Sequence, residues 1–248
     1  MANRRGWGLG KQVLNCDRIS GLEICFAELG FIKRSLYMIR TTALAVLMTV
    51  GFSVNAAEEM KIKPDLAKAK KTAETVCIAC HGADGNSPTS ANPILAGQGS
   101  EYLFKQLMNF KSVDGKPALR NNAIMGGMTA ALSTEDMQGL ALYFSQQKQK
   151  PSTATDEKLV AAGQSLWRKG DFERGIPACA GCHGPAGAGV PAQFPSLAGQ
   201  YADYTEAQLK NFRSEERAND PEKMMRSIAE KLSDKHIKAL AEYTAGLR

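Results

Sequence analysis

Apolar side chains recur at spacings of three and four in the C-terminal three quarters of the chain. Residues 101–112, EYLFKQLMNFKS, place Tyr102, Leu103, Leu107 and Phe110 on one face of a helix. Residues 133–147 and 233–247 show the same spacing, and each begins with a serine suited to cap a helix. No segment stands out for the alternation typical of a strand. The pattern predicts an all-α fold with long connections rich in glycine and proline.

The chain also repeats itself. CIACHG begins at residue 77 and CAGCHG at residue 179, an offset of 102. The same offset relates NPILAGQ to FPSLAGQ and YLFKQLMNFKS to YTEAQLKNFRS. Further on, IMGGMTAALS at residue 124 aligns with MMRSIAEKLS at residue 224, and the offset is then 100. Two homologous units follow from this, and they are predicted at residues 58–150 and 151–248.

The two units differ in length before the first cysteine, and a polar segment joins them. The second unit carries an insertion, WRKGDFERGIPA, before its first cysteine. Residues 148–156, KQKPSTATD, have no apolar periodicity and are predicted to form the linker.

The N-terminal region is typical of an export signal. Residues 38–57 combine Arg40, a short apolar core and small residues suited to cleavage. They predict a signal peptide and a periplasmic protein, and we interpret residues 1–37 as the product of a start site placed too far upstream. Residues 1–56 hold 7 Lys and Arg and 3 Asp and Glu, so the remainder carries 24 and 22, or +2. A charge this small gives no case for nucleic-acid binding.

Each unit contains two cysteines and a histidine within five residues, which is compatible with zinc binding, thiol exchange or haem attachment. A structural zinc needs four ligands, and no other Cys or His recurs in both units. Thioredoxin-like chemistry needs a βαβ setting that is missing here, whereas C-x-x-C-H is the attachment signature of c-type haem. The two motifs therefore predict two covalently bound haem c groups, at Cys77, Cys80 and His81 and at Cys179, Cys182 and His183.

The duplication also indicates a second iron ligand in each unit. Methionine is a common partner of histidine in c-type cytochromes. Met125 and Met225 are methionine in both copies, whereas Met128 and Met224 lie opposite isoleucines. We therefore predict Met125 and Met225 as ligands, with Met128 as the alternative in the first unit and Met108, Met137 and Met224 as core residues.

Residues around the predicted ligands have candidate roles. Pro93 and Pro195 each follow their histidine by 12 residues, and their carbonyl groups are candidates to accept the second ring N–H. Four further side chains have two roles open, contact with the haem propionates or ordinary core and surface packing: Tyr102, Tyr204, Arg120 and Arg217.

The paired motifs, the LAGQ after each and the M-x6-L-S of both halves resemble the dihaem cytochrome c4 family. The resemblance covers roughly residues 65–248. It implies two tandem cytochrome c-like domains, each wrapped around a covalently bound haem. It also implies peripheral inner-membrane association and electron transfer, from a quinol-oxidising complex or a dehydrogenase toward a terminal oxidase.

Filled axial positions leave no open iron site, so we expect an electron carrier and no enzyme activity. The alternatives are a dihaem subunit of a sulfide- or thiosulfate-oxidising enzyme and a dihaem peroxidase.

Overall fold

The computed structural model describes residues 15–19, 22–26 and 64–248. The chain divides into two compact units, residues 1–60 and 61–248. The predicted signal peptide and most of the predicted leader lie outside the described residues. Within the leader, β1 (Asn15–Ile19) and β2 (Leu22–Phe26) form an antiparallel pair with Ile19 opposite Leu22. This hairpin was not predicted, because each strand spans only 5 residues and alternation over so short a run is a weak signal.

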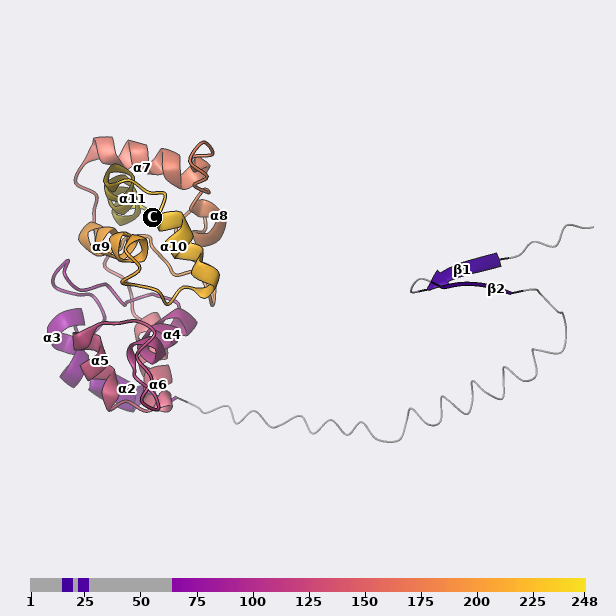
Figure 1. Ribbon diagram of the computed structural model, residues 1–248. Helices are drawn as coiled ribbons and strands as arrows, with labels where there is room; N and C mark the ends of the chain where they lie inside the picture. The colour runs from indigo at the N-terminus through magenta and orange to yellow at the C-terminus, as the bar shows by residue number, and fades with distance from the viewer. Residues whose placement is uncertain (1–14, 20–21, 27–63) are drawn as a thin grey trace, which may run out of the picture. The chain divides into compact units, whose positions relative to one another are not determined.

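Residues 64–248 are helical, as predicted, and form two groups of helices (Figure 1). The first group consists of α2 (Leu66–Thr72), the π-helical turn η1 (Ala73–Cys77), α3 (Ile78–His81), α4 (Ser100–Phe110), α5 (Ala123–Ala130) and α6 (Thr134–Ser145). The second consists of α7 (Glu157–Lys169), α8 (Ala180–His183), α9 (Ala202–Arg213), the 3-10 turn η2 (Pro221–Lys223), α10 (Met224–Ala229) and α11 (Asp234–Gly246). None of the described helices is long and apolar enough to cross a membrane.

The predicted serine caps are present. The Ser133 side chain accepts a hydrogen bond from the backbone N–H of Asp136, and Ser233 does the same for His236. Each begins a capping box, so α6 and α11 start at equivalent points of the two repeats.

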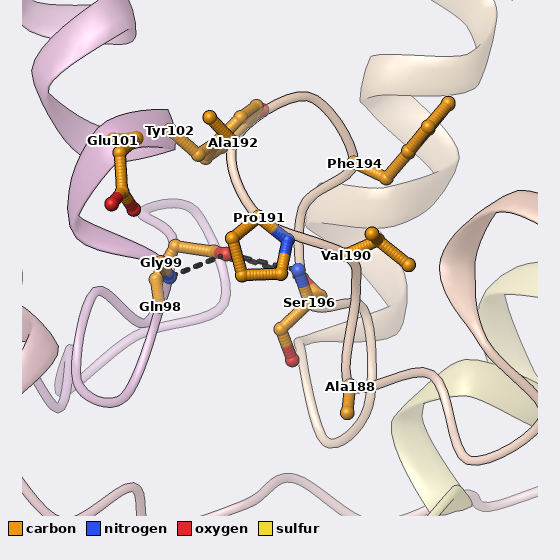
Figure 2. A pocket seen from close by; sticks show the side chains of 10 residues that line it. All are labelled: Gln98, Gly99, Glu101, Tyr102, Ala188, Val190, Pro191, Ala192, Phe194 and Ser196. Carbon is orange, nitrogen blue, oxygen red and sulfur yellow. Dashed lines mark hydrogen bonds between the residues drawn. The ribbon is translucent and has the colours of Figure 1, made fainter.

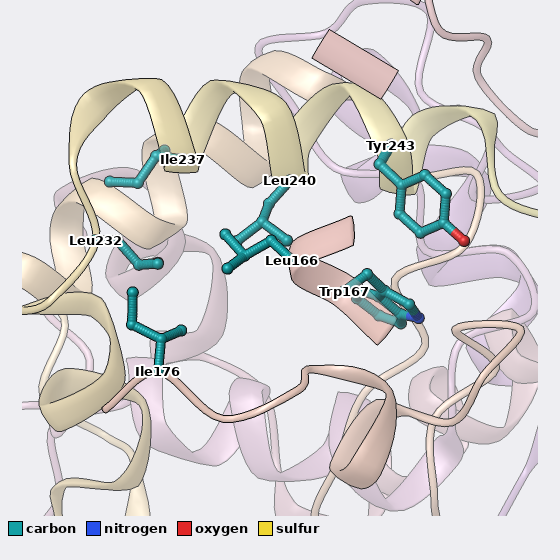
Figure 3. Close-up of a cluster of buried hydrophobic side chains, with 7 residues drawn as sticks. All are labelled: Leu166, Trp167, Ile176, Leu232, Ile237, Leu240 and Tyr243. Carbon is teal, nitrogen blue, oxygen red and sulfur yellow. The ribbon is translucent and has the colours of Figure 1, made fainter. Parts of the chain in front are cut away.

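Each half has its own apolar core. In the first half it is made of Ala69, Ala73, Leu103, Leu140, Ala141 and Phe144. In the second half it is made of Leu166, Trp167, Ile176, Leu232, Ile237, Leu240 and Tyr243 (Figure 3). The indole of Trp167 and the phenol ring of Tyr243 lie 6.0 Å apart between α7 and α11. These cores hold the helices that carry the two cysteine motifs.

The helix crossing is closer in the second half than in the first. A Cβ added to Gly163 of α7 would lie 2.0 Å from the carbonyl oxygen of Ala239 in α11. One added to Gly139 of α6 would lie 3.3 Å from Cβ of Ala69 in α2. The α7 and α11 helices can approach this closely because Gly163 has no side chain.

Candidate functional site

The two C-x-x-C-H motifs each occupy a single helical turn. Cys77 ends η1, and α3 carries Cys80 and His81, whereas Cys179 and α8 repeat the arrangement in the second half. Gly82 ends the first turn at a φ of 74°, and a Cβ there would lie 2.6 Å from the carbonyl oxygen of Asn86. The motifs are thus placed on short, sharply ended turns in both halves.

None of the four motif cysteines is in a disulfide; Cys77 and Cys179 are half-buried, and Cys80 and Cys182 are exposed. Burial raises the pKa of the Cys77 thiol to about 11 and that of the Cys179 thiol to about 11, with a smaller effect from the neighbouring cysteine. Disulfide exchange needs the thiolate, so these shifts disfavour it at Cys77 and Cys179. The described residues also contain no group of three or more His, Cys, Asp and Glu side chains able to hold a metal ion. The raised thiol pKa values reduce the support for the thiol-exchange alternative.

Both histidines of the motifs are buried and fixed by one hydrogen bond. Nδ1 of His81 lies 3.0 Å from the carbonyl oxygen of Pro93, and Nδ1 of His183 lies 3.0 Å from that of Pro195. Burial lowers the pKa of both rings, although the bonds to the carbonyl oxygens act in the opposite direction. Each neutral ring donates from Nδ1, which leaves Nε2 with a free electron pair for a metal ligand. The donor set fits a haem iron.

The two predicted methionines lie on short helices, and a polar side chain upstream of each helix accepts a backbone N–H of its first turn. Met125 is in α5, where the side chain of Asn122 accepts its backbone N–H at 2.8 Å. Met225 is in α10, where Asp220 accepts hydrogen bonds from the backbone N–H and Nε of Arg226. Both methionines are half-buried, which leaves their thioethers available. Met137 is fully buried in the first half, in agreement with its predicted core role.

The tyrosines and arginines considered for the propionates join the two halves. The backbones of Arg120 and Arg217 pair in an antiparallel bridge, and neither guanidinium forms an ion pair with a described carboxylate. Arg120 donates to Tyr204 at 3.2 Å, and Arg217 donates to Tyr102 at 2.9 Å. Burial alone would raise the pKa of Tyr102, but the charges of Arg217 and Arg120 lower it. This network places two buried cations at the contact between the two halves.

Sequence reasoning missed the glutamines of this interface. Gln106 accepts hydrogen bonds from both guanidiniums, and so does Gln208. Gln98 bonds the backbone of Ser196 in the opposite half, as Figure 2 shows, and Gln200 bonds the backbone of Ile94. The signal was present, because each of these glutamines recurs at the offset of 102.

The surroundings of the two histidines differ. The ring of His183 lies 6.2 Å from that of Trp167 and 6.0 Å from that of Phe194. In the first half, Asn92 aligns with Phe194, and Trp167 begins the segment that only the second half contains. The second site therefore has the more apolar and aromatic surroundings.

Comparison with known proteins agrees with this geometry. The family model described as Cytochrome c matches twice, at residues 66–148 and 160–247. A cytochrome c4 from Pseudomonas aeruginosa is 48% identical over 205 residues, which cover 82% of this chain and 96% of the relative. A cytochrome c4 from Thiocapsa roseopersicina is 47% identical over 186 residues, covering 74% of this chain and 92% of the relative.

Solved structures give the same result. The crystal structure of reduced recombinant cytochrome c4 from Pseudomonas stutzeri superposes with a TM-score of 0.69 at 43% identity, covering 75% of this chain and all of that one. The matches define a c-type cytochrome built from two domains. The chain belongs to the dihaem cytochrome c4 family. It therefore carries two covalently bound haem c groups and is an electron-transfer protein.

Proposed function

We propose that the chain is a periplasmic carrier that moves single electrons between respiratory proteins, without bond-making chemistry of its own. The bound haem supplies an iron atom that changes its oxidation state by one electron. In this proposal the thiols of Cys77 and Cys80 form the thioether attachments of the first group, and those of Cys179 and Cys182 form the attachments of the second.

The iron ligands we propose are His81 with Met125 and His183 with Met225. The observation that carries the histidine part of this assignment is the bond from each histidine Nδ1 to a proline carbonyl at 3.0 Å, found in both halves. That bond fixes the ring and leaves Nε2 as the ligating atom. The methionine part rests on the recurrence of Met125 and Met225 in the two copies. The thioethers of Met125 and Met225 would be the second ligands, and ligands of this kind favour Fe(II) and raise the potential. With a histidine and a methionine bound, each iron would have no site left for a substrate.

The remaining assignments follow from the proposed export. We propose residues 38–57 as a cleaved signal peptide, and residues 58–150 and 151–248 as the two domains. Peripheral association with the inner membrane would place the protein near its partners. We propose a quinol-oxidising complex or a dehydrogenase as the donor and a terminal oxidase as the acceptor.

A second candidate donor has support from the comparisons. A protein of Thiomonas intermedia named thiosulfate dehydrogenase electron acceptor is 42% identical over 172 residues, covering 68% of this chain and 77% of the relative. We propose thiosulfate dehydrogenase as an alternative donor to this chain. Reduction by such an enzyme in stopped-flow mixing, compared with reduction by a quinol-oxidising complex, separates the two.

The test of the site assignment is haem content and spectrum. The chain is expressed with haem-maturation machinery, together with Met125→Leu and Met225→Leu. We expect two haem groups per chain and a fully low-spin wild type. Each variant is expected to convert one of its two haems from low spin to high spin. Fewer than two haem groups, or a high-spin wild type that consumes peroxide, would refute the proposal.

A further inference from the structure

One peptide bond in each half connects a histidine of the motif to the opposite half. In the first half, the carbonyl oxygen of Pro93 accepts from His81, and the N–H of the same peptide bond, on Ile94, donates to Oε1 of Gln200 at 3.0 Å. Nε2 of Gln200 donates back to the carbonyl oxygen of Ile94 at 2.9 Å. Gln200 is buried, and its Oε1 also accepts the backbone N–H of Tyr201. The amide is therefore held in one orientation.

The second half repeats this arrangement with the roles exchanged. The carbonyl oxygen of Pro195 accepts from His183, and the N–H of the next residue, Ser196, donates to Oε1 of Gln98 at 2.9 Å. Nε2 of Gln98 returns a bond to the carbonyl oxygen of Ser196, also at 2.9 Å, and Oε1 accepts the N–H of Gly99. Figure 2 shows Gln98 between Gly99 and Ser196. We call Gln98 and Gln200, with the two peptides that they bind, the glutamine clasp.

The clasp has a consequence for the histidines. A peptide group that donates its N–H becomes more polarised, so its carbonyl oxygen becomes a better acceptor. A better acceptor at Nδ1 raises the basicity of a ligating imidazole. A more basic ligand stabilises the oxidised iron and lowers the reduction potential. Each glutamine thus acts on the histidine of the half to which it does not belong.

We propose that Gln98 and Gln200 are positioning residues that set the reduction potential of the haem in the opposite domain. This rests on the proposed function, in which His81 and His183 bind iron. The clasp makes the potential of each centre depend on contact with the other domain, so the two centres are tuned as a pair.

The experiment uses the full haem-loaded chain and replaces each glutamine with methionine, a side chain of similar size that forms no comparable hydrogen bonds. The potentials of the two haems are measured separately in a redox titration followed by NMR. For Gln200→Met we expect the first-domain haem to move to higher potential while the second stays unchanged. For Gln98→Met we expect the reverse.

Gln149→Met is the matched control. Nε2 of Gln149 donates to the carbonyl oxygen of Ala198 at 3.0 Å, so this variant also removes a glutamine bond to the second domain. Gln149 lines the same small cavity as Gln98 and Gln200 but hydrogen-bonds neither proline peptide, so we expect both potentials to stay at their wild-type values. A second readout is amide hydrogen exchange, in which Gln200→Met speeds exchange at Ile94 about tenfold, and Gln98→Met does so at Ser196.

Two results would overturn the inference. One is that neither glutamine variant changes either reduction potential, and the other is that only the haem of the substituted domain changes its potential. Should Gln200→Met fail to fold, Gln200→Glu keeps an acceptor for the N–H of Ile94. It is then expected to hold the first-domain potential at or below the wild-type value, and a higher potential would contradict the clasp. A high-spin wild type would refute the proposed function itself, whereas low-spin haems insensitive to the glutamines would refute the clasp alone.

Discussion

Replacing Gly163 with alanine tests how closely α7 and α11 are packed. The new Cβ would lie 2.0 Å from the carbonyl oxygen of Ala239 and 2.6 Å from Cβ of Tyr243. Because a carbon atom and a carbonyl oxygen in contact lie about 3.3 Å apart, the helices must separate by about 1.3 Å. A gap of that size forfeits a large part of the dispersion energy between facing side chains, including those of Trp167 and Leu240.

The expected loss follows from two opposing effects. Overpacking of a core costs about 1–3 kcal/mol, and the upper end applies because the atom in the way belongs to the backbone and is held in α11. Alanine gains about 1 kcal/mol over glycine in a helix. We therefore expect Gly163→Ala to lower the free energy of unfolding by about 2 kcal/mol. For a domain of 60–100 residues this lowers Tm by about 8–16 °C.

Gly139→Ala is the matched control in the first domain. Its Cβ would meet Cβ of Ala69 at 3.3 Å, a contact that small movements can relieve, so the gain in helix propensity offsets it. Thermal and guanidinium unfolding, followed by far-UV circular dichroism, compares the two variants at equal haem content. Equal losses in both variants, or no loss in Gly163→Ala, would refute this account of the crossing.

Three further predictions concern the interface and the methionine helices. Arg217→Gln should lower the free energy of unfolding by about 2 kcal/mol in chemical denaturation, because it leaves buried acceptors unpaired, whereas the exposed Arg174→Gln should change it little. Burial raises the pKa of Asp220, but its bonds from Arg226 outweigh this and lower it below the ordinary value. The stability that this carboxylate contributes is therefore present above a pH of about 4 and is lost as the pH falls through the lower folded-state pKa. In a pH titration of the low-spin spectrum, Asp220→Asn should remove this loss of stability in acid. Trp167→Ala should open the aromatic surroundings of the second histidine to water and lower the potential of that haem alone in a redox titration.

The repeat explains why so much of the site was predictable from the sequence. Each motif residue is local to one turn, and alignment of the two copies is the basis on which Met125 and Met225 are proposed from among several methionines. The bonds from His81 to Pro93 and from His183 to Pro195 followed from equal spacing in both halves. Helix positions followed from apolar periodicity and serine caps, which are also local signals.

The contacts between the halves were not predictable in the same way. Glutamine, tyrosine and arginine on a helix face are equally suited to solvent, and periodicity does not show which of them meet across a pseudo-symmetric interface. Gln98 and Gln200 were visible as repeated letters, but their partners lie 98 and 106 residues away in the sequence. The close crossing of α7 and α11 at Gly163 was also not predictable. A glycine within a helix lowers the helix propensity, and the sequence alone does not show that a neighbouring helix packs against it.

The most direct test of the account is a reductive titration of the purified chain that counts electrons and follows the spectrum of each haem. The account predicts uptake of two electrons per chain by two low-spin centres. It also predicts that Met125→Leu and Met225→Leu each change the potential of one centre and leave the other in place. Uptake of a single electron, or a methionine variant that leaves both centres unchanged, would contradict it.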